Sequence, residues 1–516
     1  MHQVGKGHTG VADTGHTTVW VMGDQLNRDL VHLRGRDPAN TRVLMVFSEQ
    51  KLTERIWHSQ KLHLVITAMR RFAAELSHAG FAVDLRRAEN LTAGFHAHVD
   101  TFGPSQVVAM EPASRTGTNT LRGLDVTLYD NDHFLCHWSR FDQFRDGRKR
   151  TTMEDFYRWR RIETGILMDG DEPAGGKFNH DQDNRKTPDK HLVADAAATP
   201  PIVTPLDAFD STVADWMPAN MPRFGAEPTG VWATSRVEAL ARLERFVTTV
   251  LPRFGDHQDA MVYGAWHLNH ALLSHALNLS LLHPGEVIDA AVDAYTAGHA
   301  PINAVEGFVR QVLGWREYLW GMYKSGEASY ANRNALNATE PLPPLFSGQA
   351  DTQMRCVSDT LASVYAHGYA HHIQRLMVLA NLATLAGVNP QAFTGWMHGM
   401  FIDAYDWVMV PNVIGMGTFA DGGEIATKPY VSSGAYIDRM SRDYCKPCRY
   451  DRSQRSGEDA CPFTTLYWDF LDRNRDTLSK NHRLAQPYAN LNRLDDLAAV
   501  RERAATVKRG LAAGTV

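Results

Sequence analysis

Cysteine is scarce in this sequence, with five residues among 516. So few thiols argue against the disulfide framework of a small secreted domain and favour a reducing, cytoplasmic location. No apolar run is long enough to cross a membrane, and the stretch 1–18, rich in Gly, His and Thr, lacks the apolar core of a signal peptide. The net charge is only −5, so any site for DNA must be a local basic patch.

Four of the five cysteines fall between residues 356 and 461. Cys445 and Cys448 form a C-x-x-C pair that can give two thiolates to one metal centre, and Cys356 and Cys461 bring the number to four. Four thiolates suit either a structural zinc or an iron–sulfur cluster, and the spacing alone does not choose between them. The plain alternative is a set of buried, reduced cysteines without a metal.

The N-terminal part alternates short apolar runs with helical periodicity. These patterns predict one long helix over 58–78 and strands over 18–22, 43–47, 81–85 and 106–110. Such alternation is typical of a parallel, Rossmann-like sheet, in which ligands bind at the carboxyl ends of the strands. The loop Gly23-Asp24-Gln25 follows the first predicted strand and is expected at such an end.

The middle of the chain is basic and then irregular. Between 140 and 161 it carries many Arg and Lys residues, among them Arg148, Lys149 and Arg150. This segment is a candidate DNA contact, although most charge runs are simply solvated faces. Residues 169–215 are rich in Asp, Pro, Gly and Ala and are predicted to form a long connector, which in a compact protein is usually functional or mobile.

From about residue 235 onward helical periodicity dominates. Helices are predicted over 256–282, 302–323, 360–385 and 462–471. The expected organisation has three parts: an α/β domain over 18–138, a basic helix and interdomain linker over 139–234, and an all-α domain over 235–500. The last part is large enough to enclose a cofactor.

Several motifs occur in the order found in one known family. The segment 302–318 (INAVEGFVRQVLGWREY) resembles the flavin-domain motif of the photolyase/cryptochrome superfamily. Gly23-Asp24-Gln25-Leu26 is similar to the opening motif of its iron–sulfur branch, the bacterial cryptochromes and (6-4) photolyases. Further similar motifs lie at 147–149, 153–158, 165–168, 428–430, 433–434 and 436–441. With the four cysteines, the resemblance covers residues 18–490.

The resemblance implies an antenna-binding α/β domain and a helical catalytic domain that binds FAD. It implies that the four cysteines hold a [4Fe-4S] cluster, and that Arg375 and Asp403 form the ion pair found across the flavin ring. The expected antenna is 6,7-dimethyl-8-ribityllumazine. The remaining cofactor-binding candidates are Ser274, Asn278, Gln311, Trp315 and Met409 in the flavin domain and Gly23, Asp24 and Gln25 in the antenna domain.

The resemblance also implies a proton donor beside a DNA lesion. His372 precedes the flavin Arg by three positions, as the donor of (6-4) photolyases does, with His371 beside it. Histidine suits this role because its charge is adjustable near neutral pH; the alternative is an ordinary core histidine. Tyr430 matches an aromatic position near the lesion pocket. The second active-site His of eukaryotic relatives would fall at Leu376 and is absent.

Three positions depart from the pattern of the family. Gly348 stands where a Trp is usual, and Met397 follows the inner electron-transfer residue Trp396 where a Tyr is frequent. The usual route of electrons to the flavin is therefore broken or rerouted, and Tyr436 is a further electron-transfer candidate. Phe47 stands in place of a Glu expected to contact the antenna, which weakens the antenna site.

The sequence as a whole predicts a monomeric enzyme that repairs (6-4) photoproducts in UV-damaged DNA by electron transfer from light-excited, reduced FAD. One alternative is a blue-light receptor that has the same cofactors and little or no repair. A third hypothesis is an iron–sulfur module that binds nucleic acid without photochemistry, which bound FAD would exclude. His372 and the basic segment favour repair, whereas Gly348 favours altered signalling or a function in the dark-reduced state.

Overall fold

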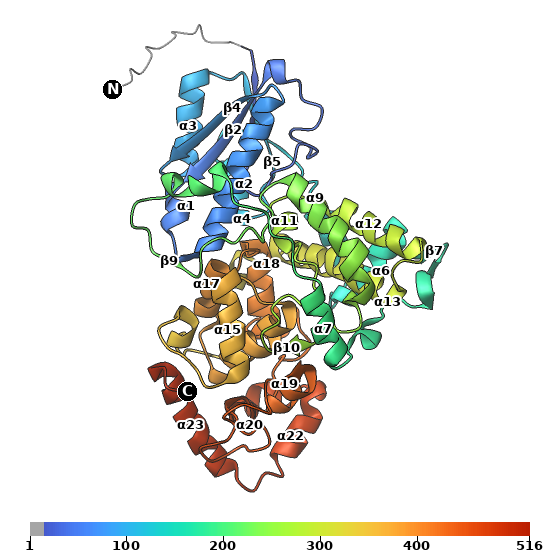
Figure 1. Ribbon diagram of the computed structural model, residues 1–516, viewed down its shortest axis with the longest axis vertical. Coiled ribbons are helices and arrows are strands. Elements are labelled where there is room, and N and C mark those ends of the chain that lie inside the picture. Colours follow the sequence, from blue (N-terminus) through green and yellow to red (C-terminus); the bar gives the residue numbers. More distant parts are fainter. Residues whose placement is uncertain (1–14) are drawn as a thin grey trace.

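The computed structural model describes residues 15–516, and its N-terminal part is built on a parallel sheet (Figure 1) that has five strands. The strand order is β4-β2-β1-β5-β6, with parallel pairing throughout. These strands are β1 Thr17–Trp20, β2 Thr41–Ser48, β4 Ala82–Ala88, β5 Gln106–Met110 and β6 Thr127–Tyr129. The four predicted strands and the α/β sheet are confirmed. The expectation for the stretch 1–18 lies almost wholly outside the described residues.

Alternate residues of the central strands face two separate cores. Val19 belongs to the core shared with α2 (Ser59–His78), while Trp20 stacks on Phe95 of α3 (Leu91–Phe102) at 5.3 Å between ring centroids. Successive strand side chains point to opposite faces, and here both faces are covered, which is why the strands read as continuous apolar runs. The helix predicted over 58–78 is confirmed.

The second half of the chain is helical, as predicted (Figure 1). The helix expected over 302–323 consists of α13 (Ile302–Val309), a π-helical segment over 310–316 and α14 (Glu317–Ser325), and the helix over 462–471 is α20 (Pro462–Arg473). Other long helices are α9 Arg236–Arg245, α12 Pro284–Thr296, α15 Arg355–His367, α17 Pro390–Met400 and α23 Leu497–Ala513. Within residues 15–516, no helix combines the length and apolarity needed to cross a bilayer.

The helix predicted over 256–282 is wrong for most of its length. Only α11 (Ser274–Asn278) is α-helical there, and the residues before it form turns and the short strand β10 (Met261–Val262). Leu268 and Leu272 have φ of 41° and 55°. A residue in the left-handed backbone conformation ends the hydrogen bonding of a right-handed helix. The spacing of apolar residues does not predict where such a residue occurs.

The helix predicted over 360–385 is interrupted. α15 ends at Gly368, whose φ is +61° and at which a Cβ atom would come within 2.7 Å of a methyl group of Ile402. The chain resumes as a π-helical segment over Gln374–Ala380, followed by α16 (Asn381–Ala386). Glycine is required here both by the backbone conformation and by the close contact. The interruption places residues 368–371 on a short loop, and the helical conformation resumes at His372.

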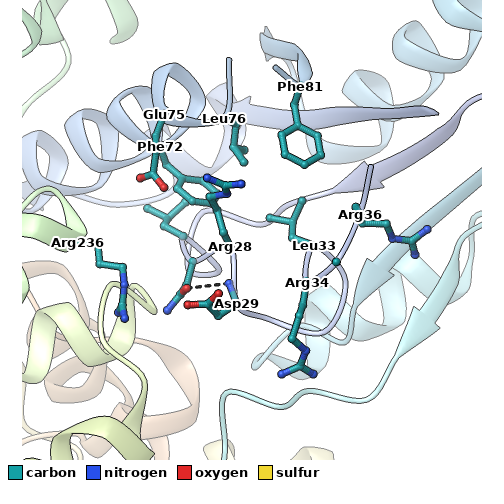
Figure 2. A pocket seen from close by; sticks show the side chains of 13 residues that line it. Arg28, Asp29, Leu33, Arg34, Arg36, Phe72, Glu75, Leu76, Phe81 and Arg236 are labelled. Atoms are coloured by element: carbon teal, nitrogen blue, oxygen red, sulfur yellow. Dashed lines mark hydrogen bonds between the residues drawn. The ribbon is translucent and has the colours of Figure 1, made fainter. Parts of the chain in front are cut away.

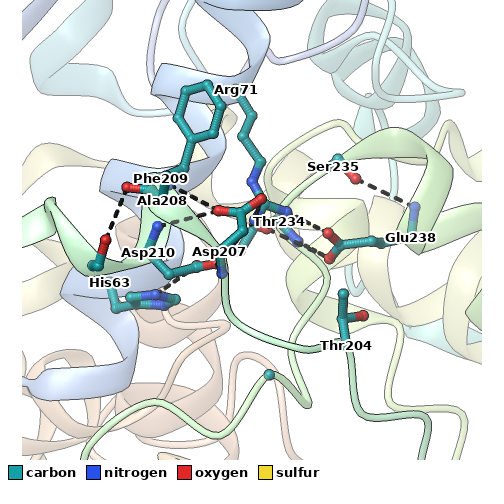
Figure 3. Close-up of polar contacts among 12 residues, drawn as sticks. His63, Arg71, Thr204, Asp207, Ala208, Phe209, Asp210, Thr234, Ser235 and Glu238 are labelled. Atoms are coloured by element: carbon teal, nitrogen blue, oxygen red, sulfur yellow. Dashed lines mark hydrogen bonds and ion pairs between the residues drawn. The ribbon is translucent and has the colours of Figure 1, made fainter.

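The connector over 169–215 contains short elements, among them α7 (Lys190–Ala198) and α8 (Ala208–Ser211), and Arg71 on α2 holds it in place (Figure 3). The Arg71 guanidinium lies 3.0 Å from Asp210 of α8 and also pairs with Glu238 of α9. His63 lies 2.8 Å from the same Asp210 carboxylate. The Arg71, Asp210 and Glu238 side chains are only 4–14% exposed, so this cluster of compensated charges ties the sheet, connector and helical part together.

Candidate functional site

Four of the predicted flavin-site residues meet around one buried carboxylate. Arg375 donates two hydrogen bonds to Asp403, at 2.9 and 3.0 Å, so the expected ion pair is present. Ser274 donates to the same carboxylate at 2.7 Å, and the Asn278 amide donates to the Asp403 backbone carbonyl at 2.7 Å. Burial opposes ionisation of Asp403, but the charge and hydrogen bonds of Arg375 outweigh it and keep the pKa of the carboxyl below its usual value. The site therefore holds a fixed ion pair.

The two predicted histidines differ sharply in environment. His371 is fully buried, and neither of its ring nitrogens has a hydrogen-bond partner in the described part of the chain. Its ring stacks on that of His270, with centroids 4.5 Å apart. His372 is exposed, although partial enclosure by protein, aided by Arg375, lowers its pKa to about 4. His372 thus faces open space beside the ion pair, whereas His371 is a buried ring with unused hydrogen-bonding capacity.

The connector supplies charged residues that the sequence did not identify. Asp181 forms an ion pair with Arg310 of the flavin-motif segment, at 3.3 Å, and its charge raises the pKa of His372. Burial and then the charge of Asp181 raise the pKa of the Asp259 carboxyl to about 6. Burial and then Asp259 raise the pKa of Tyr436 to about 12. The only signal in the sequence was the length of the connector, which suggested a functional segment without naming these residues.

Several predicted residues lie away from this ion pair or interact only locally. Gln311 donates to the Gly307 carbonyl one helical turn earlier, at 3.3 Å. The Trp315 ring is half-buried beside Tyr318. Met409 is buried in the core of the helical part, and Tyr430 is 38% exposed.

The loop at the end of β1 packs against the helical part. Gln25 is buried and donates to the Met110 carbonyl at 3.2 Å, and the Asp24 carbonyl accepts from Ser280 at 2.6 Å. Burial raises the pKa of the Asp24 carboxyl to about 6. Asp24 and Gln25 line a narrow cavity with Asn278, so this loop borders the flavin-site candidates as well as the carboxyl edge of the sheet.

The four cysteines predicted to bind a metal line one small pocket, together with Tyr444 and Tyr450. Cys356 is buried at the start of α15, and the other three are half-buried. Burial raises the pKa of the Cys445 thiol to about 12 and that of Cys356 well above its usual range. Within residues 15–516, no three His, Cys, Asp or Glu side chains stand together as ligands of a single metal ion.

Trp396 is surrounded by phenylalanine. Its indole N–H donates to the Phe346 carbonyl at 2.6 Å, and its ring contacts those of Phe346, Phe393 and Phe401 at centroid distances of 4.8, 5.8 and 5.8 Å. The Arg375 guanidinium lies 4.3 Å from the Phe401 ring centroid, so Trp396 is separated from the ion pair by one phenylalanine.

The predicted DNA-binding residues are exposed and line an open groove of about 1070 Å³. The Arg148 guanidinium lies over the Phe144 ring, and Arg150 donates to the Gly423 carbonyl at 3.2 Å. Further along the same basic run, Arg161 is fully buried and donates to the Phe178 carbonyl at 3.0 Å. Arg160 and Arg161 are therefore not available to a partner, whereas Arg158 is exposed like Arg148, Lys149 and Arg150.

A second groove, of about 370 Å³, lies between the loop over 26–36 and α2 (Figure 2). Arg28, Arg34 and Arg236 line it, beside the rings of Phe72 and Phe81. Arg34 and Arg236 pair with carboxylates outside the groove, at 3.1 and 2.8 Å. The predicted site residues do not line it. Two of its four arginines are paired in this way, whereas Arg28 and Arg36 form no ion pair within residues 15–516.

Comparison with known proteins identifies the family. Residues 19–226 match the family described as deoxyribodipyrimidine photo-lyase-related protein. A (6-4) photolyase of Agrobacterium fabrum is 39% identical over 491 residues, covering 93% of this chain and 96% of that protein.

Two solved structures share the fold. A bacterial class III photolyase from Agrobacterium tumefaciens has a TM-score of 0.57 at 17% identity, covering 82% of each chain. A Synechocystis sp. PCC6803 cryptochrome has a TM-score of 0.52 at 12% identity, covering 79% of this chain and 83% of that one. Together with the near full-length relative, they show that the chain belongs to the bacterial (6-4) photolyase branch of the photolyase/cryptochrome superfamily.

Proposed function

We propose that the protein repairs (6-4) pyrimidine photoproducts in DNA with light. The observation that carries this proposal is the 39% identity to a (6-4) photolyase over almost the whole of both chains. The exposed His372 beside the Arg375–Asp403 pair supports it, because the proposed reaction needs a proton donor that can reach a substrate.

FAD is the proposed cofactor, and the residues present fit it. The ion pair of Arg375 with Asp403 offers a guanidinium that remains charged in a buried site, and the unpartnered nitrogens of His371 leave hydrogen-bonding capacity for a bound group. When bound and reduced, FAD would supply the electron on illumination. Ser274 and Asn278 would act by holding the Asp403 carboxylate and its backbone in place.

His372 is proposed to hold the proton that the lesion receives. Its pKa of about 4 makes it neutral at neutral pH in the absence of substrate. Negative charge brought by DNA phosphates would raise that pKa, so the ring would become protonated when a lesion is bound. His371 would remain neutral because its burial, and then the nearby His270, lower its pKa well below the usual range.

For the four cysteines we propose a [4Fe-4S] cluster. All four line one pocket, as a common centre requires. Ligands of one zinc ion must crowd into a single tetrahedron, whereas a cluster with one iron per thiolate keeps its ligands further apart. The resemblance of the four-cysteine pattern to the iron–sulfur branch of the family favours the cluster over zinc.

Damaged DNA is the proposed partner, and Arg148, Lys149 and Arg150 are the proposed phosphate contacts because they are exposed along one groove. The antenna candidate, 6,7-dimethyl-8-ribityllumazine, would bind at the loop that contains Asp24 and Gln25. That loop lies at the carboxyl edge of the parallel sheet, where ligands of such sheets bind.

The test of the proposed function is illumination of a defined oligonucleotide that contains one (6-4) photoproduct, with chemically reduced protein, followed by chromatography of the products. We expect restored pyrimidines in the light and none in the dark. A protein that binds FAD and the oligonucleotide but restores nothing under illumination would contradict repair and leave the receptor hypothesis.

A further inference from the structure

Lys61 lies on α2 of the N-terminal α/β part, and its side chain is buried against the helical part of the protein. The residue is 5% exposed, and its Nζ donates to the carbonyl oxygens of His398 and Ala404, at 2.7 Å each. The ring centroids of Trp57 and Tyr405 lie 4.7 and 5.7 Å from the same nitrogen. A lysine is rarely buried so deeply unless its polar end has partners, and here backbone carbonyls of the helical part supply them.

The two carbonyls that Lys61 contacts lie on either side of Asp403. Asp403 stands on the turn between α17 and α18 (Asp406–Val410). The His398 carbonyl belongs to the last turn of α17, where a helix leaves its carbonyl groups without intrahelical partners. Ala404 directly follows Asp403 in the chain. Lys61 therefore joins the end of one helix to the backbone beside the flavin-site carboxylate.

The start of α2 also contacts the segment that leads to His371. The Nε2 of His58 lies 3.0 Å from the Tyr365 carbonyl oxygen, and the Gln60 amide donates to the Ala366 carbonyl at 2.5 Å. These two carbonyls stand at the end of α15, just before the loop over 368–371. One helical turn of the α/β part thus contacts the backbone near both groups of flavin-site residues.

The contact of Lys61 with the turn does not depend on its charge. Burial lowers the pKa of Lys61 to about 7, although the charge of Asp403 acts in the opposite direction. A protonated amine has three N–H groups and a neutral one has two, so either form can donate to both carbonyls. The backbone beside Asp403 is therefore held on both sides of neutral pH.

We propose that Lys61 is a positioning residue of the flavin site: by holding the backbone at Ala404 it fixes the Asp403 carboxylate, and through that carboxylate the Arg375 guanidinium. This rests on the proposed function, in which FAD binds beside the Arg375–Asp403 pair. If the turn were free to shift, the binding of FAD would have to order these groups and would become weaker. A residue of the α/β part would then set how well the helical part binds its cofactor.

The test compares two buried lysines in the full-length protein. Lys61→Met removes the donor and keeps most of the side-chain volume. Lys324→Met is the matched control, because the Lys324 side chain is 4% exposed and its hydrogen bonds within residues 15–516 go to Glu111, Pro112 and Thr118, none of which belongs to the turn at Asp403. Both variants should lose stability, so a lower melting temperature alone does not test the inference.

Hydrogen exchange of the apoprotein, measured by mass spectrometry on peptides that cover 398–406, reports on the turn without the cofactor. The amides of Ile402 and Ala404 donate to the Gly368 and Phe401 carbonyls, at 2.9 and 3.2 Å, so they are protected while the turn is held. We expect this segment to exchange at least about tenfold faster in Lys61→Met, as for the loss of one charge-assisted hydrogen bond, and to change by less than about twofold in Lys324→Met.

The affinity for FAD, measured from the quenching of flavin fluorescence, is the second readout. The Kd should rise at least about tenfold in Lys61→Met and less than about twofold in Lys324→Met. In an Asp403→Asn background Lys61→Met should have a smaller effect than in the parent, because two residues that act through one group are not additive. Lys61→Gln, with a shorter and neutral donor, is the second variant should Lys61→Met not fold, and the same directions are expected.

Three results would overturn the inference. The first is unchanged exchange of the segment 398–406 in Lys61→Met. The second is an equal loss of FAD affinity in Lys61→Met and Lys324→Met, which would indicate general destabilisation. The third is an additive effect in the Asp403→Asn background, which would show that Lys61 does not act through Asp403. Should the parent bind no FAD, the proposed function fails, whereas the exchange measurement still decides whether Lys61 holds the turn.

Discussion

Replacement of His372 by Ala is the perturbation that most directly tests the proposed chemistry. His372 is exposed and makes no hydrogen bond or ion pair within residues 15–516. Its removal should therefore change the free energy of unfolding by less than about 0.5 kcal/mol, as for other surface substitutions. Arg375 and Asp403 keep their two hydrogen bonds to each other in the variant, so FAD content should not change.

The same substitution should change the rate of repair far more than it changes the stability of the protein. General acids contribute about 10²–10⁴-fold, so we expect His372→Ala to repair a (6-4) oligonucleotide at least about a hundredfold more slowly, with unchanged affinity for it. The assay is single-turnover illumination of reduced protein with the oligonucleotide in excess of its Kd, together with a binding measurement in the dark.

A substitution of His371, the buried residue next to His372, supplies the matched control. His371→Phe keeps a ring in the stack with His270 but removes both unpartnered nitrogens. Because the nitrogens of His371 are offered to FAD, the activity of this variant is compared per bound FAD; if His372 is the donor, that activity should be far higher than in His372→Ala. Normal repair by His372→Ala combined with loss in His371→Phe would refute the assignment, and His371 or a water molecule would then have to be the acid.

Three further predictions concern the proposed iron–sulfur cluster, the binding of DNA, and the buried ion pairs of Arg71 with Asp210 and Glu238 (Figure 3). Cys461→Ala should remove iron measured by elemental analysis and lower the melting temperature, because metal binding is coupled to folding; stoichiometric zinc in the parent would contradict this. Lys149→Ala should weaken binding to damaged DNA, reduce the salt slope by about one and spare the rate once bound. Arg71→Met should cost about 3 kcal/mol because it leaves the buried Glu238 carboxylate without its cation and Asp210 with only His63, whereas Arg34→Met, in a surface pair whose Arg is 61% exposed, should cost under about 1 kcal/mol in thermal unfolding.

The sheet could be predicted because its signal is local. Each central strand is a short apolar run covered on both faces, and α2 presents apolar residues at helical spacing to that same sheet. The site was harder to predict, because its geometry depends on interruptions of periodicity. Gly368 ends a helix that apolar spacing carries through to residue 385, and this break puts His371 on a short loop and His372 at the start of the next helical segment. His270 lies on a segment that the same spacing predicted to be helical.

Contacts between residues that are far apart in the sequence could not be predicted either. Asp181 stands in a stretch without periodicity, and its pairing with Arg310 joins positions 129 residues apart. Composition can show that such a connector is long, but it does not show which of its residues contact the rest of the protein. For Ser274 and Asn278 the sequence identified the residues but not their contacts. The motif resemblance predicts that they bind the cofactor, and in the structure their side chains donate hydrogen bonds to Asp403.

The interrupted route of electrons leads to a final prediction. Trp396 is surrounded by phenylalanine rings, which are much harder to oxidise than tryptophan or tyrosine. A different aromatic series reaches the ion pair: the half-buried Trp266 contacts Trp232 and Tyr369 at 5.9 Å each, and the Arg375 guanidinium lies 5.0 Å from the Tyr369 ring centroid. We expect Trp266→Phe to slow light-driven flavin reduction, with an external thiol as electron donor, more than Trp396→Phe does. Both variants should repair at the parental rate when reduced chemically beforehand. Parental photoreduction in Trp266→Phe, with a strong loss in Trp396→Phe, would return the inner-donor role to Trp396.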